Sequence, residues 1–116
     1  MEKVRLGRTN LSVTKLGWGG IPIQRVAEED GVAVIKAVIN LGVDFLDTAR
    51  GYTNSEHRVG LALQGVSKPV ILSSKSQTRT EKIEEDVQMS LKQIKVSKIH
   101  IYHAHAVNSF HDYEKV

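Results

Sequence analysis

Short apolar segments recur along the chain about every 28 residues, and this spacing constrains the fold more than any other feature of the sequence. Each segment is rich in β-branched and aromatic residues, as β-strands are. The segments are residues 13–19, 43–47, 70–74 and 98–102. The stretches between them are long enough for a helix, so the sequence predicts strands and helices in alternation. Such alternation is typical of right-handed βαβ units that build a parallel sheet.

Helical patterns fill the stretches between these strands. Residues 28–41 place apolar side chains on one face, begin with three acidic residues and are followed by a glycine, which predicts a helix. Two further helices are predicted over residues 55–64 and 79–94, the second with Thr78 and Glu81 as a capping box. A fourth helix is expected to begin within the final segment, SFHDYEKV.

Two closures of such a sheet fit the pattern: an open doubly wound sheet, or part of a (β/α)8 barrel, which takes about 250 residues. The segment VRLGRTNLSV predicts two short strands around a Gly-Arg-Thr-Asn turn. An open nucleotide-binding sheet more often begins with a long strand and a G-x-G-x-x-G turn, which GWGGIP does not match. The sequence therefore favours an α/β barrel portion, with a capping hairpin over residues 1–12 and four βα units over residues 13–116.

The composition indicates a globular chain and excludes several functions. Hydrophobic residues make up 41% and charged residues 25%, which is typical of folded domains. The net charge of +3 is spread along the chain without a basic block, so no nucleic-acid partner is expected. The sequence has no long apolar run or signal segment, so we expect a cytoplasmic protein without a membrane partner. The absence of cysteine excludes a disulfide scaffold and thiol catalysis.

Polar side chains fall at the carboxyl ends of the predicted strands, the edge at which α/β folds bind ligands. Asp47 ends the second strand, Lys75 follows the third, and His103 and His105 follow the fourth. Alternation along each strand puts these side chains on the same face as the apolar residues that precede them. Tyr52 follows Asp47 after a short interval, so a loop can bring its ring over the same edge. The sequence therefore predicts a polar site above a layered apolar core.

An aspartate, a tyrosine, a lysine and a histidine together form a proton-donating set. A phenol, with a pKa of about 10, is a poor acid at neutral pH, but a nearby ammonium group stabilises the phenolate and lowers that pKa. The carboxylate can hold the lysine in place, and a histidine nitrogen can hydrogen-bond the carbonyl oxygen of a substrate. The set suits reduction of a carbonyl group, for which a nicotinamide cofactor has to supply hydride.

Four stretches of the chain resemble the aldo-keto reductase family, in the family's order. DTARGYTNSE is similar to its motif of an Asp-Thr-Ala turn, a tyrosine and a Ser-Glu helix start. LGRTNLSVTKLGWGG is similar to its capping hairpin and first strand, and ILSSK and IYHAHAV to the ends of its third and fourth strands. The resemblance covers the whole chain and implies the N-terminal half of a TIM (β/α)8 barrel. It also implies NADPH-dependent reduction of aldehydes or ketones to alcohols, or the reverse oxidation.

The resemblance gives these residues roles by position. Asp47 and Lys75 would tune the acid, Tyr52 would donate the proton, and His105 would orient the carbonyl substrate. One repeat of about 28 residues beyond Lys75 points to His103 instead. The family has a tyrosine three residues before its histidine, as this chain has in YHAH, so the resemblance favours His105.

Few cofactor contacts are expected within this chain. By the same resemblance, Gly20 and Ile21, which follow the first strand, and Asp47 match positions near the nicotinamide of NADPH. Most contacts to the adenosine and the phosphates would come from units beyond the fourth. A truncated gene, a proteolytic fragment and one half of an assembled barrel are all consistent with this length. A half barrel exposes two strand edges, which predicts a homo-oligomer or another partner that covers them.

Two other functions compete with the reductase. A four-unit piece can persist as a non-catalytic fragment or as an interaction module. The two histidines of HAH can bind zinc, as in metal-dependent hydrolases built on barrels. In those enzymes, by resemblance, the pair lies on the first strand, so no metal ligand is assigned here. Glu56, in the first turn of the second predicted helix, is interpreted as stabilising the helix dipole.

Overall fold

The computed structural model describes residues 1–78 and 82–115. It begins with an antiparallel pair of short strands, as the sequence predicts, and continues with alternating strands and helices. The elements are β1 (Lys3–Arg5), β2 (Ser12–Thr14), β3 (Trp18–Gly19), the 3-10 helix η1 (Pro22–Arg25), α1 (Glu28–Asn40), β4 (Phe45–Asp47), α2 (Ser55–Leu63), β5 (Ile71–Ser76), α3 (Ile83–Ile94), β6 (Ile101–Ala104) and α4 (Phe110–Glu114).

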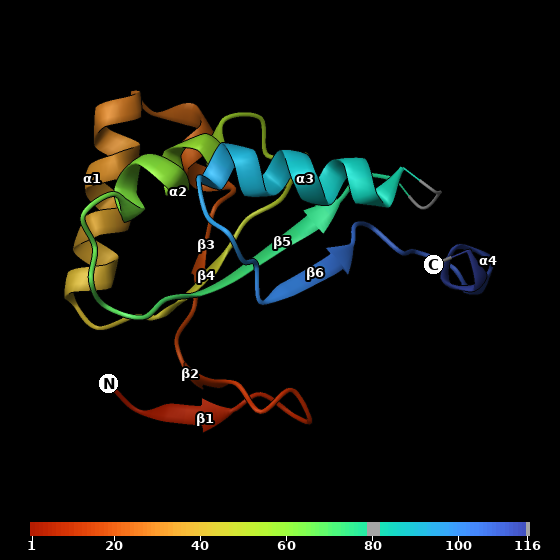
Figure 1. The fold of residues 1–116 in the computed structure, drawn as a ribbon, viewed down its shortest axis with the longest axis horizontal. Helices are drawn as coiled ribbons and strands as arrows, with labels where there is room; N and C mark the ends of the chain where they lie inside the picture. Colours follow the sequence, from red (N-terminus) through yellow and green to blue (C-terminus); the bar gives the residue numbers. More distant parts are fainter. Residues whose placement is uncertain (79–81, 116) are drawn as a thin grey trace.

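The four later strands form one parallel sheet in the order β3-β4-β5-β6, so each strand lies beside the next one in the chain. Figure 1 shows α1, α2 and α3 together on one side of this sheet. A doubly wound sheet carries helices on both faces, whereas a barrel wall carries them only on the outside. The arrangement is therefore that of part of a barrel wall, with β3 and β6 as its edge strands.

The apolar core lies between the sheet and the helices. Leu46 of β4 and Leu72 of β5 are buried against the helices. The other buried members of this core are Ile23, Ile35, Ile39, Val59, Ala62 and Ile94. Because side chains alternate along a strand, the neighbours of the two leucines, Asp47 and Ser73, lie on the opposite face of the sheet, away from the helices.

Asp44 joins the β1–β2 hairpin to the amino-terminal end of β4. Its Oδ1 accepts a hydrogen bond from the backbone N–H of Thr14 at 2.8 Å, and its Oδ2 lies 2.5 Å from Lys3 Nζ. Its own N–H donates to Thr14 Oγ1 at 3.2 Å. Burial raises the pKa of Asp44, but the hydrogen bonds and charge of Lys3 and the Thr14 bonds outweigh it, so the pKa is lowered overall. The hairpin is thus fixed beneath the sheet, as Figure 1 shows.

The sequence pattern was wrong about one strand over residues 13–19. Val13 and Thr14 belong to the hairpin, and only Trp18 and Gly19 join the sheet. The Thr14 hydroxyl donates to the carbonyl of Leu16 at 2.7 Å, which bends the chain between the two strands. The hairpin therefore runs to Thr14, past the predicted boundary at residue 12. Apolar periodicity continues through this bend because Val13 is buried in the hairpin and Trp18 packs, partly buried, against the core.

The remaining boundaries follow the predictions closely. The predicted helices over 28–41 and 55–64 are confirmed as α1 and α2, each one residue shorter. The fourth strand begins later than predicted, at Ile101, because His100 turns inward: its Nδ1 accepts the N–H of Leu72 at 3.1 Å. The predicted capping box of Thr78 and Glu81 includes a residue outside the described ranges. None of the helices in the described ranges is long and apolar enough to cross a lipid bilayer.

Candidate active site

An ion pair joins the carboxyl ends of β4 and β5. Lys75 Nζ lies 2.5 Å from Asp47 Oδ2 and also donates to the carbonyl of Thr48 at 2.8 Å. Ser73 Oγ donates to the other carboxylate oxygen of Asp47 at 2.8 Å. The Lys75 side chain is 17% exposed and that of Asp47 is 37% exposed, so the pair lies at the rim of the sheet rather than in free solvent. The lysine ammonium is therefore held in one position by two acceptors.

Tyr52 lies in the loop between β4 and α2, and its ring faces this ion pair. Its backbone N–H donates to Ala49 O at 3.1 Å, and its carbonyl accepts the N–H of Ser55 at 2.7 Å, so the loop turns back on itself. Thr53 completes the turn with a left-handed φ of 40°. Lys75 Nζ lies 5.1 Å from the centre of the Tyr52 ring, within cation–π range.

The two candidate histidines differ in their surroundings. The ring of His105 lies edge-on to the ring of Tyr52, with centroids 5.5 Å apart and planes at 84°. His103 lies opposite Lys75 in the strand register but its side chain is exposed. The structure therefore brings Asp47, Tyr52, Lys75 and His105 together at one edge, and leaves His103 outside this contact.

A hollow of about 510 Å³ lies beside Asp47 and Tyr52. Gly19, Gly20, Ile21 and Pro22 form its other wall, so it contains each residue that the sequence predicts for nicotinamide binding. The wall is tied to the site by the N–H of Gly20, which donates to Asp47 O at 2.9 Å. An apolar wall with a polar group at one end is typical of cofactor pockets.

The wall is also joined to the tyrosine loop. Gln24 Nε2 donates to Ile21 O at 2.9 Å, and its Oε1 accepts from Thr53 Oγ1 at 3.1 Å. The two sides of the hollow are thus connected by side chains far apart in sequence. Sequence reasoning missed Gln24. Alternation along the strand places Ser73 on the face of Lys75, but the sequence alone assigned it no role beside Asp47.

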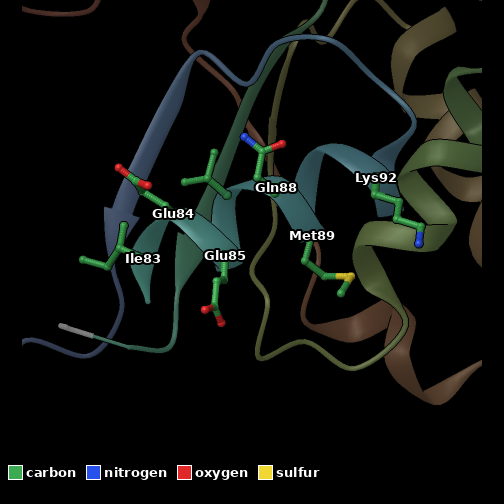
Figure 2. A pocket seen from close by; sticks show the side chains of 7 residues that line it. Ile83, Glu84, Glu85, Gln88, Met89 and Lys92 are labelled. Carbon is green, nitrogen blue, oxygen red and sulfur yellow. The ribbon is translucent and has the colours of Figure 1, made fainter. Parts of the chain in front are cut away.

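A larger hollow, of about 830 Å³, lies over α3, away from these residues. It is lined by Ile83, Glu84, Glu85, Val87, Gln88, Met89 and Lys92. Figure 2 shows that these side chains come from one helix and point in several directions. Because no set of polar groups converges there, we assign the candidate active site to the smaller hollow.

The zinc alternative gains no support from the geometry. Within residues 1–78 and 82–115, no group of three or more His, Cys, Asp or Glu side chains is arranged to hold a metal ion. A zinc site needs at least three protein ligands at short distance. The described part of the chain therefore offers the two histidines no third ligand.

The chain is similar to known proteins of one family over most of its length. Residues 14–116 match the family described as the Aldo/keto reductase family. L-galactose dehydrogenase from Arabidopsis thaliana is 29% identical over an alignment of 123 residues, which covers 92% of this chain and 39% of that protein. Pyridoxal 4-dehydrogenase from Microbacterium luteolum is 35% identical over 80 residues, which cover 64% of this chain and 23% of that protein.

The fold is shared with solved structures of the same family. An aldo-keto reductase from Bacillus halodurans, in its holo form, is 31% identical and superposes with a TM-score of 0.78, covering 88% of this chain and 39% of that one. The chain thus spans at most 39% of the length of these three relatives. The parallel sheet with helices on one side corresponds to part of their (β/α)8 barrel. Since the family match extends over residues 14–116, the chain belongs to the aldo/keto reductase family.

Proposed function

We propose that this chain carries the proton-transfer residues of an NADPH-dependent reductase of aldehydes and ketones. The observation that carries the proposal is the position of Lys75, whose ammonium is 2.5 Å from Asp47 Oδ2 and 5.1 Å from the Tyr52 ring centre. A phenol needs a nearby cation to act as an acid at neutral pH. The ion pair supplies that cation in a fixed place, which a surface lysine would not.

Each residue has a separate task in this proposal. Tyr52 donates its hydroxyl proton to the carbonyl oxygen of the substrate, and Lys75 stabilises the phenolate that remains. Asp47 and the Thr48 carbonyl hold Lys75 at that distance. His105, in contact with the Tyr52 ring, hydrogen-bonds the carbonyl oxygen and so orients the substrate.

The hollow beside Tyr52 fits the nicotinamide end of the cofactor. Gly20 and Ile21 would hold the apolar side of the ring, and Asp47 lies at the polar end of the same hollow. Gly19 leaves open space above the backbone, since a methyl group there would meet no atom within 4 Å. When bound, NADPH supplies the hydride that reduces the carbonyl carbon.

The relatives support an oxidoreductase but not one substrate. Two of them are named as dehydrogenases, of L-galactose and of pyridoxal, which are different molecules. We therefore propose a small carbonyl compound or its alcohol as the substrate, and leave its identity to experiment. Cytoplasmic location and self-association through the β3 and β6 edges stay predictions.

A second candidate is a piece of the barrel that does not bind NADPH by itself. The observation that favours it is that the chain covers 39% or less of the length of these relatives. Titration of the chain with NADPH, followed by cofactor fluorescence, separates the two. Saturable binding and oxidation of NADPH by a small aldehyde are expected for the reductase, with turnover lost in Tyr52→Phe. If the fluorescence does not change up to millimolar NADPH, the chain does not carry the activity by itself.

A further inference from the structure

Glu56 is buried on the side of the sheet that faces the helices, although it lies in the first turn of α2. It is 3% exposed. Its Oε1 accepts hydrogen bonds from Ser74 Oγ at 2.7 Å and Ser90 Oγ at 2.6 Å, and its Oε2 pairs with Arg50 Nη1 at 2.5 Å. The sequence-based interpretation, a first-turn residue that stabilises the helix dipole, is therefore incomplete. A buried carboxylate with this many partners joins four separate segments of the chain.

We call Arg50, Glu56, Ser74, Ser90 and Tyr102 the Glu56 cluster. The hydroxyls of Ser90 and Tyr102 lie 3.0 Å apart, and because Ser90 donates to Glu56, the phenol donates to Ser90. Burial raises the pKa of Tyr102, with the charges of Glu56 and Asp86 adding to this and the Ser90 bond opposing it. The Tyr102 hydroxyl therefore stays protonated and can donate its hydrogen bond to Ser90.

A second carboxylate extends the cluster along the same strand. Asp86 of α3 lies 4.0 Å from Arg50 Nε, and its Oδ2 accepts from Ser76 Oγ at 2.6 Å and from the N–H of Gln77 at 3.1 Å. Arg50 thus lies between two carboxylates from different helices. The result is a polar layer between β5 and the helices, in a place where barrels usually have apolar packing.

Residues of this polar layer lie next to the candidate catalytic residues in the sequence. Ser74 and Ser76 flank Lys75 on β5, and Arg50 lies two residues before Tyr52. The N–H of Arg50 also donates to the carbonyl of Lys75 at 3.1 Å. Because neighbouring side chains of a strand point to opposite faces, fixing the two serines on the helix face fixes Lys75 on the other face.

Apart from the hydrogen bonds of its own turn and the bond between Thr53 and Gln24, the tyrosine loop is held through the ion pair of Arg50 with Glu56. Its own turn contains a residue with left-handed backbone, Thr53, at a φ of 40°. Gly51 lies close to the side chain of Gln77, since a Cβ there would lie 2.6 Å from Gln77 Nε2. Arg50, which pairs with Glu56, directly precedes this glycine in the loop. Loss of this ion pair is therefore expected to loosen the segment that carries the Tyr52 ring.

We propose that Glu56 is a positioning residue, which acts through Arg50 to keep the Tyr52 ring against Lys75 and His105. The inference rests on the proposed function, because the contact it maintains is that of the proton-donating set. Glu56 touches neither substrate nor cofactor in this scheme. Its effect is on the distance between Tyr52 and the two residues that assist it.

The test compares Glu56→Gln with a matched core variant by nuclear magnetic resonance. Glu56→Gln keeps the side-chain volume but removes the charge opposite Arg50. We expect the Overhauser contact between the rings of Tyr52 and His105 to be lost in this variant. Val59→Ala, in the next turn of α2 and fully buried, lowers stability without touching the Glu56 cluster, so the contact should persist there.

Arg50→Gln provides a second variant, at a side chain that is 24% exposed and so tolerates replacement more readily. It should lose the same ring contact while circular dichroism shows an intact fold. Persistence of the contact in folded Glu56→Gln and Arg50→Gln would overturn the proposal, as would equal loss in Val59→Ala. Failure of the proposed function is distinguishable, since it leaves the wild-type chain with the ring contact but without NADPH binding.

Discussion

The ammonium of Lys75 lies 5.1 Å from the centre of the Tyr52 ring, although 22 other residues separate the two in the chain. Asp47 and the carbonyl of Thr48 hold the ammonium there. A cation beside a phenol stabilises the phenolate form, so the proton donation proposed for Tyr52 requires this contact.

Replacing Lys75 tests that dependence. Lys75→Met keeps most of the side-chain length but removes the charge, so turnover of an aldehyde with NADPH should fall on the order of 10²-fold or more. Because the proposal makes Tyr52 and Lys75 act as a unit, adding Tyr52→Phe to Lys75→Met should cost little more than either change alone. Turnover is measured from NADPH absorbance, with Lys36→Met, an exposed position on α1, as the control. Additive losses in the double variant would contradict the assignment.

Gly20 is predicted to be intolerant of a side chain. A Cβ at this position would lie 2.3 Å from Ser55 Oγ, which already accepts a hydrogen bond from Thr48 Oγ1 at 2.7 Å. We expect Gly20→Ala to lower the free energy of unfolding by about 1 to 3 kcal/mol. Adding Ser55→Ala removes the clashing oxygen and should restore part of the loss. Urea unfolding of the wild type and the two variants measures this, and a double variant no more stable than Gly20→Ala would contradict the explanation.

Gly60 allows α2 and α3 to pack closely. A Cβ there would meet the backbone carbonyl oxygens of Gln93 at 2.6 Å and Ile94 at 2.8 Å, neither of which can move alone. Gly60→Ala should therefore destabilise the fold by about 1 to 3 kcal/mol, although alanine is the better helix former. Gly31→Ala in α1 is the matched control, because its Cβ would meet only side chains, the closest being Arg58 Nη1 at 3.2 Å. Thermal unfolding should show the larger loss at Gly60.

Asp44 should make stability depend on acid pH. Its pKa is lowered in the folded chain from an ordinary value of 3.8, so its contribution is fully present above that value and is lost as the pH falls through the folded pKa. Asp44→Asn should cost about 1 to 2 kcal/mol near neutral pH, because the buried N–H of Thr14 keeps a weaker acceptor. The difference in the free energy of unfolding between wild type and Asp44→Asn, measured with urea, should be smaller at about pH 3 than near neutral pH. A constant gap would show that the charge of Asp44 contributes nothing.

Lys3→Met distinguishes the contribution of the ion pair between Lys3 and Asp44 from that of the Thr14 hydrogen bonds. The Lys3 side chain is 52% exposed, so its ion pair is screened by solvent and should contribute less than about 1 kcal/mol. A cost larger than that of Asp44→Asn would mean that the hairpin is held mainly by the ion pair rather than by the Thr14 hydrogen bonds.

Sequence periodicity predicted α1 and α2 to within a residue and a parallel sheet, because burial of one face leaves a local pattern. It failed between residues 13 and 19, where two short strands with apolar side chains follow each other across a bend. The bend depends on Thr14 and on Asp44, 30 residues later, and no local pattern reports such a partner. The same limit applies to Glu56, whose burial requires serines from β5 and α3.

The sequence by itself determined which residues stand at the carboxyl ends of the strands, since alternation and spacing fix both the face and the edge on which Asp47 and Lys75 lie. The tertiary structure decided between His103, to which the repeat spacing pointed, and His105, which the resemblance favoured. It alone revealed that a charged cluster rather than apolar packing lies behind Lys75. The physical reason is that periodicity records burial one element at a time, whereas a contact such as that of Tyr52 and His105 depends on how a loop and a distant strand end are held together.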